Sequence, residues 1–234
     1  MLLIKLAVKN LTRHKRRVLA IALILAIGIT VYLTIDSLML GLTQLSFDNL
    51  INLETGHLQV VKPEYWSQRE KLPLIDLITW GYTLKREIKK EKNVKALVPQ
   101  LKFSAQLNNG VDQLPVVGYG IDTTRALKVF THEDYIVAGD YFSGSDYEVL
   151  LGKKLAGLMG FELGDYLTLL VKTSEETFNT IDAKIIGLVN TPNPKVNRNF
   201  VYLPLSTAQR ALDVNNKISQ VIVRLENEKK LNQT

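Results

Sequence analysis

A long apolar segment near the N-terminus constrains this chain more than any other feature. The run from Val18 to Ile35 holds 18 residues and no charged side chain. A helix rises about 1.5 Å per residue, so this run would reach about 27 Å, close to the thickness of a bilayer's hydrocarbon core. The segment therefore predicts a transmembrane helix, and it ties the work of the protein to a membrane.

The distribution of charge predicts how the helix crosses the membrane. Residues 1–17 contain six basic and no acidic residues, so the whole formal net charge of +6 precedes the apolar run. Basic residues favour the cytoplasmic side of a span. We expect a single pass through the cell (inner) membrane, with the N-terminus in the cytoplasm and most of the chain outside it. The balanced charge of the remainder argues against nucleic acid as a partner.

Two other interpretations of the apolar run fit the sequence less well. A cleaved signal peptide should have a shorter apolar region followed by a small-x-small cleavage site, which is not evident here. A buried core helix fits poorly with five consecutive ionisable residues, Arg13 to Arg17, at its start. An uncleaved membrane anchor accounts better for both features.

The helical pattern continues beyond the span. Leu38, Leu42 and Leu45 recur at helical spacing, which predicts one helix that reaches about Glu54 as an amphipathic stalk. The stalk could pack on its own domain or form a seam with a second subunit or partner permease, and one sequence leaves both open.

The rest of the chain predicts interleaved helices and strands, and hence a mixed α/β or α+β body. Gly56 to Lys62 reads as a turn and strand, Asn108-Asn109-Gly110 as a hairpin turn, and residues 191–194 as an exposed loop. Helices are expected at 79–91, 122–130, 153–159 and 205–212, and further strands at 94–99, 103–107, 113–120, 148–151, 166–172, 178–190, 200–203 and 219–225.

The motifs of several enzyme classes are missing from the sequence. The Gly152-Lys153-Lys154 segment lacks the earlier glycine of a phosphate loop, and Gly118-Tyr119-Gly120 has Thr123 where a dinucleotide fingerprint needs its third glycine. The chain has no cysteine, its three histidines are far apart, and no G-x-S-x-G motif occurs. We expect no enzyme activity in the chain itself, no cofactor and no metal site. His132-Glu133-Asp134 is expected to be a solvated loop.

Several segments together carry a resemblance to a known family. They are Leu6 to Arg17, Gly56-His57-Leu58-Gln59-Val60, Val117 to Asp122, Gly139-Asp140-Tyr141-Phe142, Val149 to Ala156, Gly164 to Leu169 and Asn199 to Gln209. In this order and spacing the chain resembles the N-terminal half of MacB/FtsX-type ABC transporter permeases, within them the LolC/LolE-like lipoprotein-releasing branch.

The resemblance implies an extracytoplasmic MacB-like periplasmic core domain and a permease that passes the motion of an ATPase through the membrane. It implies a cytoplasmic ABC ATPase, a second permease subunit or a homodimer, membrane lipid, and a lipoprotein or other periplasmic cargo as partners. The basic residues Lys5, Lys9, Arg13, Lys15, Arg16 and Arg17 are the candidates for contact with the ATPase or the membrane face. They could equally serve only to set the topology.

The predicted organisation has five parts. These are a basic amphipathic cytoplasmic segment at 1–17, the transmembrane helix at 18–42, the stalk at 43–55, the periplasmic-core-like domain at 56–226 and a polar tail at 227–234. Permeases of this family carry three more spans, and this sequence has no second long apolar run. We therefore expect either a piece of a longer permease or a chain that works beside a separate subunit.

A membrane-anchored binding or sensor module remains the competing interpretation. The sequence does not distinguish lipoprotein release from efflux or a role in cell division, and it identifies no cargo-contact residues.

Overall fold

The computed structural model describes residues 14–227. The chain divides into two compact units, residues 1–48 and residues 49–234, and each is described by itself. Lys5, Lys9, Arg13 and nearly all of the predicted polar tail lie outside the described residues. The boundaries predicted for the span, the stalk and the domain stay predictions.

The first unit is built on α2 (Lys15–Leu50), which begins one residue after the start of the described chain and ends two residues into the second unit. It is the described helix that is long and apolar enough to cross a membrane, with a mean hydropathy of 2.7 over its best window. A five-residue π-helical turn (Ile51–Thr55) follows it directly. The predicted continuation of the helix to about Glu54 is therefore confirmed, although its last turn is wider than an α-helical one.

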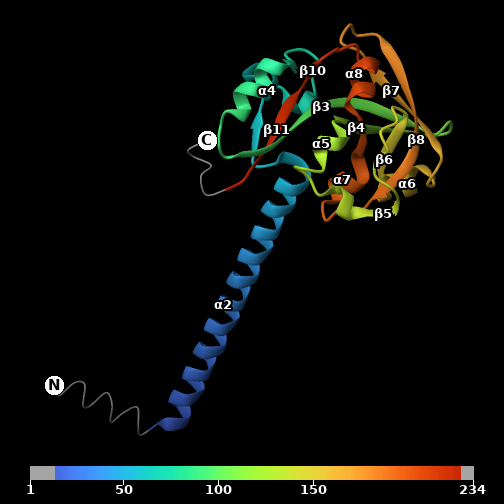
Figure 1. The fold of residues 1–234 in the computed structure, drawn as a ribbon. Helices are drawn as coiled ribbons and strands as arrows, with labels where there is room; N and C mark the ends of the chain where they lie inside the picture. The colour runs from blue at the N-terminus through green and yellow to red at the C-terminus, as the bar shows by residue number, and fades with distance from the viewer. Residues whose placement is uncertain (1–13, 228–234) are drawn as a thin grey trace. The chain divides into compact units, whose positions relative to one another are not determined.

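Six strands of the second unit close into a barrel (Figure 1). Around the ring they follow the order β3-β4-β9-β6-β8-β7, and β7 pairs with both β8 and β3. Their bounds are β3 (Val94–Asn108), β4 (Gln113–Ile121), β6 (Glu148–Gly152), β7 (Tyr166–Lys172), β8 (Phe178–Val189) and β9 (Phe200–Pro204). Two neighbouring pairs, β4 with β9 and β6 with β8, are parallel. This mixed sheet with flanking helices confirms the predicted fold class.

The long strand β3 joins the barrel to a sheet extension. The sequence predicted two strands here, split after Pro99, but one strand runs through. Its first half pairs with β11 (Gln220–Leu225), which in turn pairs with β1 (Leu58–Val60). Pro99 is tolerated because β4 pairs with β3 only from Gln100 onward, so the proline has a strand neighbour on one side only.

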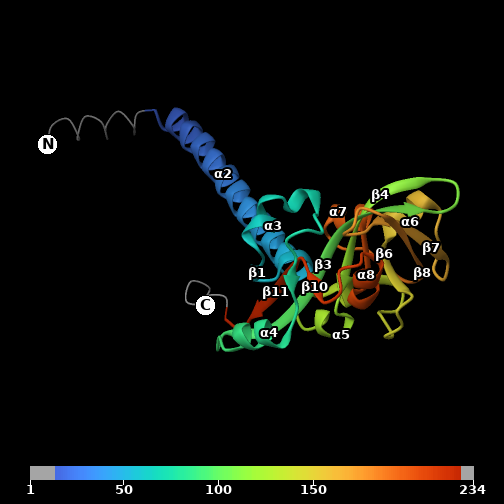
Figure 2. The same ribbon diagram turned by 90° about the horizontal axis from the view of Figure 1, so that it is seen from above.

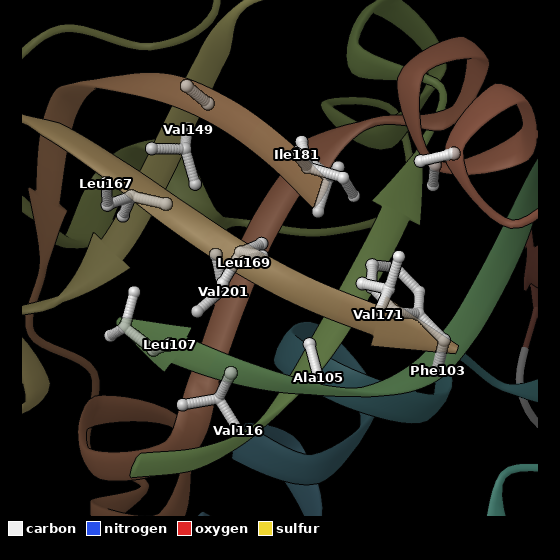
Figure 3. Close-up of a cluster of buried hydrophobic side chains, with 14 of the residues drawn as sticks. Phe103, Ala105, Leu107, Val116, Val149, Leu167, Leu169, Val171, Ile181 and Val201 are labelled. Atoms are coloured by element: carbon white, nitrogen blue, oxygen red, sulfur yellow. The ribbon is translucent and has the colours of Figure 1, made fainter. Parts of the chain in front are cut away.

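The barrel is filled by apolar side chains that alternate along its strands (Figure 3). Leu101, Phe103, Ala105 and Leu107 point inward from β3 and are at most 3 % exposed. The same period of two recurs in β7 and β8, as expected for strands with one face in a core. The alternation in the sequence therefore fixes which face of each strand forms the interior.

The helices of the second unit are short and lie around the strands (Figures 1 and 2). They are α3 (Pro63–Ser67), α4 (Tyr82–Lys89), α5 (Thr123–Ala126), α6 (Lys153–Met159), α7 (Pro194–Asn199) and α8 (Leu205–Ala211). The α6 prediction is confirmed, including its end at Gly160, which adopts φ +68°. The hairpin turn at Asn109 is also confirmed, and the Asn109 side chain donates to the Met159 carbonyl at the end of α6 (2.7 Å).

Other predictions of local structure were wrong in whole or in part. Thr79 lies in β2 (Ile78–Thr79), which pairs with β10 (Lys217–Ile218), and the helix starts only after Gly81. The loop predicted at 191–194 is confirmed for residues 191–193, but Thr191 is buried and its amide donates to the Asn197 side chain, and Pro194 opens α7. The strand β5 (Ile136–Gly139) was not predicted, because its four residues pair with β8 through a register shift.

Candidate functional site

The end of the stalk helix is hydrogen-bonded to several segments of the second unit. A helix end leaves carbonyl groups without helical partners, and buried ones need another donor. The Asn52 carbonyl accepts from the Thr131 amide (3.1 Å), and the Leu53 carbonyl accepts from His132 Nε2 (2.8 Å). Two successive carbonyls of the stalk end are thus satisfied by one loop of the domain.

Side chains add two further contacts to the same turn. Arg224 on β11 donates from Nη1 to the Asn52 Oδ1 atom (2.6 Å). Asn193, which caps the start of α7, donates from its amide to the Glu54 carboxylate. The last turn of the stalk is therefore hydrogen-bonded to three separate segments of the domain.

Gly56 allows the chain to leave the stalk and enter β1. It adopts φ +60° and ψ −161°, a backbone conformation that residues other than glycine rarely adopt. A Cβ atom there would lie 2.5 Å from Ile222 Cγ2 and 2.9 Å from the Val223 carbonyl oxygen. The next residue, His57, accepts at Nδ1 from the Leu225 amide (2.9 Å), so the Gly-His pair ties the stalk end to β11.

His132 is buried, which corrects the prediction of a solvated loop. Its ring is 2 % exposed and lies between Phe130 (centroids 4.9 Å apart) and Tyr202 (4.7 Å). Burial lowers the pKa of the imidazole from its usual 6.5 to about 4, and the hydrogen bond to Leu53 only partly opposes this. His132 is therefore neutral at pH 7. Because the Leu53 carbonyl can only accept, Nε2 carries the proton.

Lys102 is the second unusual ionisable group near the stalk end. It projects from β3 between the buried Leu101 and Phe103, and its Nζ lies 5.2 Å from the centre of the Tyr119 ring. Burial lowers the pKa of Lys102 to about 8; Glu54 opposes the shift and Lys195 adds to it. A lysine is thus held in a mostly desolvated place beside the last turn of the stalk.

The predicted site residues lie elsewhere in the sequence. Lys15, Arg16 and Arg17 occupy the first turn of α2 and are exposed, and the other three candidates lie outside the described residues. The predictions from the sequence do not include the roles of Asn52, His132 and Arg224 at the stalk end. A usable signal existed for Arg224, because it is the one charged residue of β11 and follows three apolar residues. A weaker signal existed for Lys102, which lies between Leu101 and Phe103 in β3. No local pattern marked Asn52.

Known proteins share both the sequence pattern and the fold. The family described as the MacB-like periplasmic core domain matches residues 18–234. The chain is similar in structure to the extracellular domain of the noncanonic ABC-type transporter YknZ from Gram-positive bacteria, with a TM-score of 0.50 and 16 % identity over 69 % of this chain and 83 % of that one. A likeness to the periplasmic region of MacB from Actinobacillus actinomycetemcomitans has a TM-score of 0.45 and 18 % identity, covering 63 % of this chain and 69 % of that one. With nearly its whole length matched, the chain belongs to the family of MacB-like periplasmic core domains.

Proposed function

We propose that the chain is the N-terminal part of an ABC transporter permease subunit of the mechanotransmission type. In this proposal α2 crosses the inner membrane with its basic end in the cytoplasm, and the second unit lies outside. A separate cytoplasmic ATPase supplies the energy, and a second permease subunit or a second copy completes the membrane part. We favour lipoprotein release from the membrane as the transport function, because the sequence resembles the lipoprotein-releasing branch of these permeases.

The observation that carries the proposal is the way the domain holds the stalk end. Four hydrogen bonds join Asn52, Leu53 and Glu54 to the loop before β5, to β11 and to the start of α7. Buried hydrogen bonds are costly to break without a replacement partner. A shift or rotation of the stalk would therefore act on several parts of the domain together.

The basic start of α2 is the proposed contact with the ATPase and with anionic headgroups. Lys15, Arg16 and Arg17 lie on its first turn, and Lys5, Lys9 and Arg13 precede or adjoin it in the sequence. Replacing both Arg16 and Arg17 with Ala should spare membrane insertion but reduce stimulation of the ATPase. Lys153→Ala with Lys154→Ala, on the exposed face of α6, is the matched control. Unchanged stimulation in the arginine variant would leave these residues with a topological role only.

Capture of the tagged chain from membranes tests the proposal as a whole. We expect an ABC ATPase to co-purify, together with a second membrane subunit or a second copy, and ATP hydrolysis to change on association. An intact chain recovered without an ATPase, in a procedure that retains a known permease–ATPase pair, would contradict the proposal. That result would favour an anchored binding or sensor module.

A further inference from the structure

A cavity of about 370 Å³ opens beside the stalk end within the second unit. Glu54 and Thr55, at the end of the stalk, form part of its wall. The cavity is also lined by Lys102 and Tyr119 from the barrel, by Lys195 from α7 and by Trp66 from α3.

Lys102 lacks an ion-pair partner in this cavity. Within residues 14–227, no carboxylate oxygen lies within 4.0 Å of its ammonium group. A mostly buried charge is costly unless an opposite charge or strong hydrogen bonds compensate it. The Tyr119 ring face gives only a cation–π contact, and the carboxylate of Glu54 already accepts from Asn193. The cavity therefore holds a positive charge that a bound anion would stabilise.

The net charge of the residues that line the cavity indicates which charge a bound anion should carry. Its basic residues are Lys102, Lys195 and Arg69, and its acidic residues are Glu54 and Glu70. The excess is one positive charge. A single carboxylate would be compensated, whereas a phosphate dianion would leave one negative charge uncompensated.

The remaining walls are suited to an apolar body. Phe200, Val117 and Leu72 face the same space as the Tyr119 and Trp66 rings. The Arg69 guanidinium lies 4.2 Å from the centre of the Trp66 ring, which fixes one face of that indole. A second cavity, of about 550 Å³, shares Thr55, Gln59 and Trp66 with the first and is lined by Leu58, Val61 and Pro63. Apolar surface thus continues next to the charged end.

We propose that this cavity binds a small organic monoanion, with its carboxylate beside Lys102 and Lys195 and its apolar body against Tyr119 and Trp66. Such a ligand would also contact Glu54 and Thr55, which are residues of the stalk end. The binding site does not depend on the proposed transport function, and its test needs no ATPase.

Tryptophan fluorescence provides a direct test, because the chain contains only Trp66 and Trp80. In a Trp80→Phe background Trp66 is the only indole. The full chain in nanodiscs of zwitterionic lipid is titrated with 3-phenylpropionate, with 3-phenylpropanol and with inorganic phosphate. We expect a saturable change in Trp66 emission with the carboxylate, and binding at least about tenfold weaker for the alcohol and for phosphate. Equal binding of the alcohol, or no saturable change with the carboxylate, would overturn the proposal.

Lys102→Met tests the residue on which the argument depends. Methionine keeps most of the length of the side chain and removes the charge, and we expect the dissociation constant for 3-phenylpropionate to rise at least about tenfold. Lys153→Met, on the exposed side of α6, should bind as the parent does. Unchanged binding in a Lys102→Met chain that keeps the parent's circular dichroism spectrum would contradict the assignment.

The pH dependence separates loss of charge from loss of structure. Between about pH 7 and about pH 9.5, deprotonation of Lys102 should weaken binding in the parent but not in Lys102→Met. The other ionisable groups lining this space are Glu54, Tyr65, Arg69, Glu70, Tyr119 and Lys195. The same loss of affinity in both proteins would assign the effect to one of those groups and contradict the role of Lys102.

Discussion

The barrel interior and the stalk end both contain buried groups, but those of the interior are apolar and those of the stalk end are polar. The interior cluster consists of apolar side chains such as Leu107, Leu169 and Val201, each without measurable exposure. At the stalk end the buried groups are carbonyls, an imidazole, an amide and, next to them, a lysine. Apolar packing is non-directional, whereas each hydrogen bond at the stalk end has one donor and one acceptor in a fixed geometry.

This difference indicates what each region contributes. The barrel supplies most of the free energy of folding through the burial of apolar surface. The stalk end adds little net stability per hydrogen bond but specifies one arrangement of the helix turn against three segments. Substitutions in the barrel should therefore change stability, and those at the stalk end should also change pH dependence and coupling.

The largest expected effect is the loss of a ring from the barrel. Phe103 is 1 % exposed and its ring packs on Gly118 across the β3–β4 pair. Phe103→Ala should lower the free energy of unfolding by about 3 to 5 kcal/mol, since it leaves a cavity that the closed barrel cannot fill. Denaturant unfolding measures this. Val111→Ala, at the exposed hairpin tip, is the control and should change stability by less than about 0.5 kcal/mol.

His132 should make the stability of the domain depend on pH. Its pKa is lower in the folded state (about 4) than in the unfolded state, so its contribution is present above about pH 6.5 and is lost as the pH falls toward 4. We expect the free energy of unfolding to fall by up to about 3 kcal/mol over that interval. His132→Gln should lack this part of the pH dependence. Equal slopes in both proteins would show that His132 is not protected from protonation.

A backbone substitution at the stalk end should have a smaller but clear effect. Gly56→Ala places a Cβ against Ile222 and forces an unfavourable φ, and should cost about 2 kcal/mol. Gly157→Ala is its matched control, because Gly157 lies in α6 with no atom within 4 Å of the added Cβ. That change should stabilise the domain by about 0.5 to 1 kcal/mol. If both variants were equally stable, the strain at Gly56 would be refuted.

The smallest effect has the opposite sign. Lys102 is mostly buried as a cation at pH 7, so Lys102→Met should raise the free energy of unfolding by about 1 to 2 kcal/mol in ligand-free protein. The gain should shrink as the pH rises above about 8, where the folded parent loses its proton first. A destabilised Lys102→Met at pH 7 would mean that the lysine has a structural partner.

Much of the fold was predictable because it rests on local periodicity. The alternation in β7 and β8, the glycine that ends α6 and the asparagine turn before β4 were each visible in a few residues. The closure of the barrel was not, because it depends on β7 reaching both β3 and β8. The strand β5 was not predictable either, because it is defined by an irregular pairing with the distant strand β8.

The stalk-end site was hidden from the sequence for a related reason. Asn52 and Arg224 lie 172 positions apart, and His132 is 79 positions from Leu53. The three ordinary polar residues carry no shared spacing, so only the tertiary fold brings them together. The sequence predicts a solvated loop at His132-Glu133-Asp134, but the burial of His132 is decided by the aromatic rings on either side of it.

The central claim is that the domain holds the stalk end in one position through these hydrogen bonds. The cysteine-free chain allows two spin labels to be placed without background, at Leu50→Cys on the helix end and at Lys153→Cys on α6. Electron spin–spin distance measurement should give a single narrow distribution in the parent, which broadens when Asn52→Ala and His132→Gln are combined. A broad distribution in the parent, or a narrow one that survives the double substitution, would contradict the account.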